Sequence, residues 1–275
     1  MPEHDGSQRV RTLHRRQLLW QGLVGAGALV AGPSALRALA ANSSAVDLGP
    51  TVPVAFSLPV PQIITRAEWG ADESLRSGTP DFAPLNRVIV HHTVTATDEP
   101  NPAGRIRTIH QFHTQGRGWS DIGYNFIVDG AGRIYEGRLA RAYGVGEVHD
   151  GEDSSGRGVI GAHASGHNAG SVGIALLGTY TDGRISPTDA ALDAVATLAA
   201  WKLGSRGIDP RAPGALIAHR DVVATGCPGD GCYNRLPEVR DRAFARTSST
   251  ASPDGGGLIE NLLDLVVEAP DIPLL

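Results

Sequence analysis

Residues 87–93 of this chain read Arg87-Val88-Ile89-Val90-His91-His92-Thr93, and the rest of the sequence is organised around them. A continuous run of β-branched residues is typical of a strand that is covered on both faces, so the first half predicts a short buried strand. The second half brings two imidazoles to the end of that strand, where open α/β sheets place ligand sites. Histidines in that position need partners from elsewhere in the chain.

Other stretches predict further strands. Leu216-Ile217-Ala218-His219 repeats the opening pattern, because a short apolar run again delivers a histidine at its end. Residues 172–177 predict another buried strand. Residues 124–128 and 133–136 flank Asp129-Gly130-Ala131-Gly132, which is a strong β-hairpin signal.

Three segments have helical signals. Residues 103–115 carry apolar side chains at helical spacing, including Ile106, Ile109 and Phe112, and glycines follow them. Ser186 is the expected N-cap of a second helix, with Pro187 at its first position, and that helix should end near Gly204. A last helix is expected over residues 237–246. Strands and helices together predict an α/β domain.

Composition narrows the class of protein. The 275 residues are 41% hydrophobic and 19% charged, with a formal net charge of −5, which suits one sizeable domain with appendages. No basic stripe suggests a nucleic-acid partner. The two cysteines, Cys227 and Cys232, lie too close in sequence to join distant parts of a fold, so a disulfide framework is not expected. We expect Cys232 to be a small packed residue at the start of a helix, and a redox-sensitive thiol is the alternative.

The N-terminal segment, residues 1–41, predicts a targeting signal. Arg15-Arg16 precedes a weakly apolar, glycine- and alanine-rich run, and Ala38-Leu39-Ala40 offers small residues for cleavage. The paired arginines resemble a twin-arginine signal, and an ordinary secretory signal or an uncleaved anchor is the alternative. We therefore expect export across the cytoplasmic membrane, to a secreted, periplasmic or wall-associated location.

The rest of the chain divides by composition. Residues 42–61 are expected to be a linker and residues 62–246 the folded domain. Residues 247–275 form a tail with a short amphipathic segment at 257–268, and membrane contact is expected only through the signal or this tail.

A long loop contains an acidic stretch, residues 144–160, with Glu147, His149, Asp150, Glu152 and Asp153. Such a cluster suggests either a second cation site or a solvated, flexible loop, and we favour the loop.

His91, His219 and Cys227 together suit a zinc site. Two imidazoles and one thiolate leave the fourth tetrahedral position for water or substrate, which is the arrangement of catalytic zinc. The spacing alone leaves another interpretation open, namely surface or core histidines and a small buried cysteine.

Five motifs, in order, carry a resemblance to a known family: Val88-Ile89-Val90-His91-His92-Thr93, Trp119-Ser120-Asp121-Ile122-Gly123-Tyr124-Asn125-Phe126, Gly161-Ala162-His163, Asn168-Ala169-Gly170-Ser171-Val172-Gly173-Ile174, and Ala218-His219-Arg220-Asp221 with Thr225-Gly226-Cys227-Pro228-Gly229. Over residues 62–245 the chain resembles the peptidoglycan recognition protein and type 2 N-acetylmuramoyl-L-alanine amidase family. The resemblance implies a mixed central β-sheet flanked by helices, with zinc at the floor of a surface groove. It also implies hydrolysis of the amide between N-acetylmuramic acid and L-alanine.

The same resemblance implies roles for individual residues. His91, His219 and Cys227 match the family's zinc ligands. Tyr124 matches a tyrosine near the zinc-bound water, where its phenol would position the water or stabilise the oxyanion. Thr225 occupies a position where relatives carry lysine or threonine, and it would either donate to the scissile carbonyl oxygen or cap the loop.

Other residues are matched to supporting roles. His163, Asn168 and Arg220 are expected to contact substrate or line the groove. His92 should point to the opposite face of the strand and pack there. No His-Glu-x-x-His helix is present, so Tyr124 or the substrate itself is expected to share the proton transfer.

The expected partner is peptidoglycan or its muropeptide fragments, bound by a monomer. Two alternatives remain open: a non-catalytic peptidoglycan-binding module, and a zinc peptidase that acts within the stem peptide.

Overall fold

The computed structural model describes residue 58 and residues 60–249. The predicted signal, most of the predicted linker and the tail from residue 250 lie outside the described residues, so the predictions made for them stay predictions. Within the described part of the chain, no helix is both long enough and apolar enough to cross a membrane.

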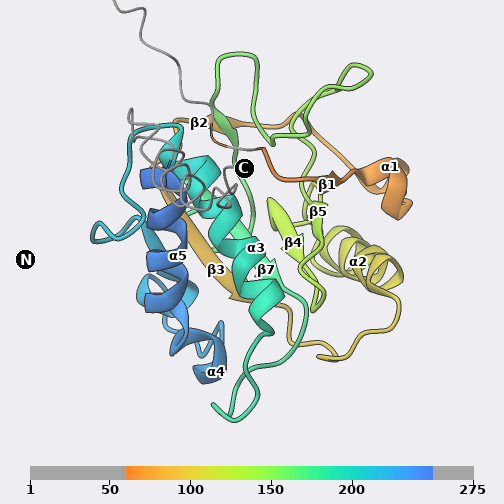
Figure 1. Ribbon diagram of the computed structural model, residues 1–275. Helices are drawn as coiled ribbons and strands as arrows, with labels where there is room; N and C mark the ends of the chain where they lie inside the picture. Colours follow the sequence, from red (N-terminus) through yellow and green to blue (C-terminus); the bar gives the residue numbers. More distant parts are fainter. Residues whose placement is uncertain (1–57, 59, 250–275) are drawn as a thin grey trace, which may run out of the picture. The chain divides into compact units, whose positions relative to one another are not determined.

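A six-stranded sheet forms the centre of the described residues, with the strand order β1-β5-β4-β7-β3-β8 (Figure 1). Neighbouring strands are parallel except for the β4–β5 hairpin, so the predicted mixed sheet is confirmed. A small antiparallel pair, β2 and β6, lies outside this sheet. The strand bounds are β1 Ile63–Ile64, β2 Phe82–Ala83, β3 Arg87–His92, β4 Phe126–Val128, β5 Ile134–Glu136, β6 Gly158–Val159, β7 Ser171–Leu176 and β8 Leu216–Ala218.

Strand β3 is the opening stretch of the sequence, and it lies between two parallel neighbours. Val90 is opposite Ile174 on β7 and Ala218 on β8. Side chains alternate between the two faces of a strand. Val88 and Val90 therefore face one core cluster, whereas Ile89 and His91 face the other side of the sheet.

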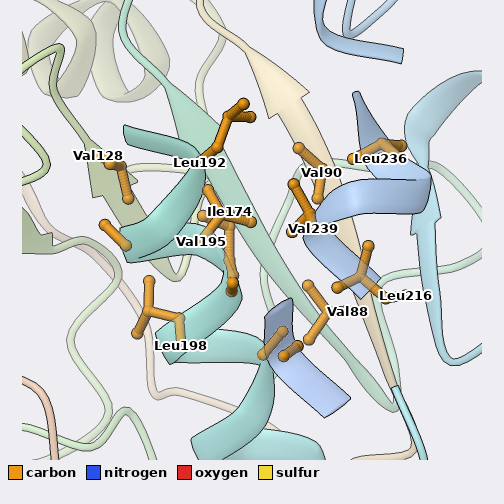
Figure 2. Packing of buried hydrophobic residues seen from close by; sticks show 14 of the residues in the cluster. Val88, Val90, Val128, Ile174, Leu192, Val195, Leu198, Leu216, Leu236 and Val239 are labelled. Carbon is orange, nitrogen blue, oxygen red and sulfur yellow. The ribbon is translucent and has the colours of Figure 1, made fainter. Parts of the chain in front are cut away.

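Two helices cover the first face: α3 (Asp189–Ala199), continued by the π-helical turn η3 (Ala200–Gly204), and α5 (Leu236–Ser249) (Figure 1). Figure 2 shows their apolar side chains packed against the strands. Each such side chain, once buried, contributes about 1.5–3 kcal/mol. The labelled contacts come from Val88, Val90, Val128, Ile174 and Leu216 on the strands and from Leu192, Val195, Leu198, Leu236 and Val239 on the helices.

The start of α3 differs from the prediction. Thr188, not Ser186, is the N-cap, and its Oγ1 accepts a hydrogen bond from the backbone N–H of Ala191 at 3.1 Å. The same hydroxyl donates to the carbonyl of Gly130 in the β4–β5 turn at 2.6 Å. This tertiary contact favours the later cap, and Pro187 consequently precedes the helix.

The opposite face carries α2 (Pro102–Gln111), followed by the π-helical turn η2 (Phe112–Gly116). A π turn contains an extra residue and so rotates the side chains that follow. Phe112 precedes this change of winding, and its N–H still bonds the Thr108 carbonyl. Predicted as part of the apolar stripe, it is instead 53% exposed, because a residue six after Ile106 lies about 120° around the helix from it. The remaining elements are short: α1 (Arg66–Trp69), η1 (Glu73–Leu75), η4 (His219–Asp221) and α4 (Asp230–Tyr233). Cys232 is fully buried on α4, as expected.

The acidic loop is exposed over residues 144–148 and 154–157, as expected of a solvated loop, but its middle part is held against the domain. Glu152 accepts from Lys202 at 2.5 Å and pairs with Arg206 at 2.6 Å. Lys202 belongs to η3 and is only 2% exposed, so its ammonium depends on this carboxylate. His149 lies 2.6 Å from the buried carboxylate of Glu136. Among the described residues, no group that could hold a metal forms in this loop.

We predict that Glu152→Gln lowers the free energy of unfolding by roughly 3 kcal/mol, because it leaves a buried ammonium without its counter-charge. Urea denaturation of the purified protein measures this. The matched control is Glu147→Gln, since Glu147 pairs with Arg141 on the exposed part of the same loop and should leave the midpoint unchanged. Equal midpoints for both variants would contradict the assignment.

Candidate metal centre

Three side chains from separate segments meet on the face of the sheet that α3 and α5 do not cover. His91 occupies the end of β3 and is 1% exposed, and His219 is the first residue after β8. Cys227 is brought back by a loop that the hydrogen bond from Arg220 N–H to its carbonyl closes at 2.9 Å. The ligand atoms of the three residues lie within 4.8 Å of one another, and the described residues contain no other such group.

The spacing of these atoms suits zinc. Tetrahedral zinc has bonds of about 2.0–2.1 Å to nitrogen and about 2.3 Å to sulfur, which places the two ligand atoms roughly 3.5 Å apart. Cys227 Sγ and His91 Nδ1 are 3.7 Å apart. One thiolate with two imidazoles is a donor set that zinc prefers, and three donors leave one position open.

Burial determines how these donors are protonated. It lowers the pKa of His91 well below its usual value, with a further contribution from neighbouring His163, and it lowers the pKa of His219 as well. Both imidazoles are therefore neutral at pH 7. Burial raises the pKa of the Cys227 thiol to about 11. The thiol thus keeps its proton at pH 7 unless a cation takes its place.

His163 lies directly behind His91. Its Nδ1 is 3.0 Å from His91 Nε2, the nitrogen that faces away from Cys227. Asn168 fixes this segment, since its Oδ1 accepts from the backbone N–H groups of His163 and Ala164, both at 2.8 Å. The ring fits because β7 carries Gly173 beneath it, where a Cβ atom would come within 2.4 Å of the imidazole.

His92 has the supporting position that was predicted for it. Its Nδ1 accepts from the backbone N–H of Tyr180, a residue of the core under α3 and α5. Its own backbone N–H points at Cys227 Sγ, 3.4 Å away. His92 therefore packs on the opposite face from His91 and helps to orient the thiol.

The three donors line a groove of about 600 Å³. One wall comes from η2 and the turn after it, with Phe112, His113, Arg117 and Trp119, and the loop of Thr225 and Cys227 also lines the groove. No Asp or Glu lines it. Arg117 lies over the ring of exposed Phe112, with its guanidinium carbon 5.3 Å from the ring centroid.

Tyr124 lies beside the donors, with its ring centroid 5.5 Å from that of His91. Burial, and then the nearby Cys227, raise the pKa of its phenol. The phenol therefore stays protonated at neutral pH and acts as an O–H donor rather than as a base.

The other predicted site residues have varied placements. Thr225 is exposed at the groove, and its Oγ1 accepts from Cys227 N–H at 3.2 Å. Arg220 is not among the groove-lining residues, because its guanidinium pairs with Asp230 at 2.6 Å and stacks on Tyr233. Asn168 does not line the groove either. Contact of these residues with substrate stays a prediction.

Sequence reasoning missed several groove residues, in particular Arg105, His113 and Arg117. Burial lowers the pKa of His113 to about 4, and its Nδ1 accepts from Gly123 N–H at 3.1 Å. The neutral ring therefore carries its proton on Nε2 and is a second donor in the groove. The one signal in the sequence was the pair of glycines after the predicted helix, Gly116 and Gly118, because they mark the place where the regular α-helix ends.

Comparisons with known proteins identify the family of this chain. Residues 81–230 match the family model described as N-acetylmuramoyl-L-alanine amidase. A pig protein of that name is 34% identical over 200 residues, which are 70% of this chain and 30% of the pig protein. The chain thus spans less than a third of that relative.

Two further matches cover most of the compared protein. Peptidoglycan-recognition protein 1 of Holotrichia diomphalia is 34% identical over 64% of this chain and 79% of its own length. A crystal structure titled as tracheal cytotoxin bound to the ectodomain complex of peptidoglycan recognition proteins LCa and LCx is 31% identical. It matches with a TM-score of 0.50, over 64% of this chain and 95% of the other.

We predict that Gly173→Ala destabilises the protein by roughly 2 kcal/mol, because the added methyl group must displace the packed ring of His163. Thermal or urea unfolding measures the loss. Gly226→Ala is the matched control, since a Cβ at that position meets nothing within 4 Å. A Gly173→Ala protein as stable as the wild type would show that the ring does not occupy this space.

Proposed function

This chain belongs to the N-acetylmuramoyl-L-alanine amidase family, and from that premise we propose that it is a zinc-dependent amidase. Its proposed substrate bond is the amide between N-acetylmuramic acid and the L-alanine of the peptidoglycan stem peptide. The observation that carries the proposal is the complete donor set of His91, His219 and Cys227 beside Tyr124 in one groove. A non-catalytic peptidoglycan-binding module would need the groove but would not need these metal donors and the tyrosine beside them.

The donor residues would hold zinc at the floor of the groove. When bound, zinc supplies a Lewis acid for the scissile carbonyl and lowers the pKa of a bound water to about 7. His163 would accept a hydrogen bond from Nε2–H of His91, which fixes the tautomer that leaves Nδ1 for the metal. The His92 backbone N–H would stabilise the thiolate of Cys227.

Two donors of the chain would act on the reacting carbonyl. The phenol of Tyr124 stays protonated and so would donate to the negative charge that develops on the oxygen. Thr225 is exposed at the groove and would add a second hydroxyl. Because no carboxylate lines the groove, a side-chain base of the Glu type is absent from the described site. Solvent, or the substrate itself, would accept the proton.

The groove suits an anionic peptide. Arg117 lines it together with the aromatic rings of Phe112 and Trp119, and no acidic side chain is among the lining residues. Arg105 also lines it, but its guanidinium pairs with Glu99 at 2.6 Å. A muropeptide combines carboxylates with aliphatic stems, which these groups would bind. The structural relative that holds tracheal cytotoxin supports this class of ligand. Peptidoglycan lies outside the cytoplasmic membrane, so the proposal also needs the predicted export signal.

Digestion of defined muropeptides tests the proposed function. We expect release of the intact stem peptide, detected by mass spectrometry, and its loss on chelation of zinc. Cys227→Ala should lose both the metal and the activity, whereas Cys232→Ala, which changes the buried cysteine on α4, should keep both. Cleavage inside the stem peptide would indicate a zinc peptidase. Stoichiometric zinc without any cleavage would indicate a binding module.

The role of Tyr124 has its own test. We expect Tyr124→Phe to keep its zinc and to lower kcat by roughly 10²–10³, the usual loss on removal of one oxyanion donor. Tyr143→Phe is the matched control, because that phenol bonds Asp150 in the acidic loop and does not line the groove. Full activity in the Tyr124→Phe protein would remove Tyr124 from the mechanism.

A further inference from the structure

Val94 has a backbone conformation that valine rarely adopts. Its φ is +55°, and it is the only residue other than glycine with a positive φ among those described. The left-handed region is unfavourable for β-branched side chains in particular, because the second γ substituent crowds the backbone. Glycine or asparagine would fit this position with less strain.

The neighbours of Val94 hold it in that conformation. Thr93 is attached to the end of β7 and the loop after it, since its N–H donates to the Leu176 carbonyl at 3.0 Å and its Oγ1 accepts from Gly178 N–H at 3.1 Å. Thr95 is attached to the same loop, through its N–H to the Gly178 carbonyl at 3.3 Å and through its carbonyl to Thr179 Oγ1 at 2.8 Å. Residues on both sides are thus fixed, and Val94 alone accommodates the turn between them.

The side chain of Val94 brings no compensating burial. It is 64% exposed and lines the groove three residues after His91. An apolar side chain in a strained conformation, with most of its surface in water, contributes little to folding. Strain of this kind at a groove points to a role in ligand binding.

We propose that Val94 is a specificity-determining residue whose isopropyl group packs against a methyl group next to the scissile amide. This inference rests on the proposed function, because the amidase substrate carries two such groups, the methyl of L-alanine and the methyl of the lactyl ether. Both are small aliphatic groups on either side of the scissile amide, and Val94 lines the same groove as the metal donors. Ile109 and Phe112 line the same groove and add apolar surface there.

The test compares Val94→Gly and Val94→Ala with the wild type on three muropeptides. One is the natural substrate, one has glycine in place of L-alanine, and one has a glycolyl ether in place of the lactyl ether. For the wild type we expect roughly tenfold selectivity in kcat/KM for the natural substrate over the analogue that lacks the contacted methyl. Val94→Gly should lose that selectivity, and Val94→Ala should be intermediate.

Other readouts separate this role from a structural one. Val94→Gly should keep its zinc content and unfold at the same or a higher temperature, because it relieves strain. Val145→Ala changes a fully exposed valine outside the groove and should alter neither stability nor selectivity. A Val94→Gly protein with wild-type selectivity on both analogues, or one that is less stable than the wild type, overturns the proposal.

Binding measurements keep the inference apart from the proposed function. Calorimetry measures the affinity of each of the three muropeptides for protein whose zinc has been removed with a chelator. The ratios of these affinities give the binding selectivity without hydrolysis. A wild type that cleaves nothing but loses binding selectivity in Val94→Gly would contradict the amidase and support the role of Val94. A wild type that cleaves all three muropeptides and shows no preference among them, in binding or in cleavage, would support the amidase and contradict the role of Val94.

Discussion

The parallel hydrogen bonding of β3 between β7 and β8 is the constraint on which the site depends. It fixes the strand on both edges, so that His91 and His92 must face opposite sides of the sheet. One histidine then joins His219 and Cys227, and the other packs against Tyr180 and donates its backbone N–H to the thiol. A strand with a free edge would hold these positions less firmly, since register on a buried strand is strongly specified.

Around this rigid strand, the groove is built from segments whose backbone conformation or residue type is unusual for the helix, turn or strand in which they lie. The π turn η2 interrupts the α-helical winding after α2, and Val94 lies in a region of φ that suits glycine. Gly173 leaves a space in β7 that the ring of His163 fills. Each departure would cost stability by itself, and each lies at the groove or directly behind it. Such departures are expected where binding and catalysis, rather than folding, select the residue.

Buried charge is the second feature that the local pattern did not reveal. Lys202 lies in a helical stretch whose apolar neighbours predict a core helix, and Glu152 lies in a loop that reads as solvated. Only the fold brings the two within 2.5 Å, and the pair then holds the loop against η3. Propensity describes each segment separately, so a loop ordered by a partner 50 residues away looks flexible in the sequence.

The sequence by itself predicted β3, β4, β5, β7 and β8, because short apolar runs bounded by turn residues are typical of strands, and its motifs indicated the candidate donor residues. It did not predict the two-residue strands β1, β2 and β6, which are too short to carry a pattern. It also placed His92 on the opposite face, since alternation is a property of any strand. Only the tertiary structure decided that His163 backs His91, that Thr188 caps α3 and that Val94 faces the groove under strain. The reason is the same in each case, because these features depend on contacts between segments that are distant in the chain. The local sequence pattern does not contain the information about which residue of a distant segment will pack against a given position.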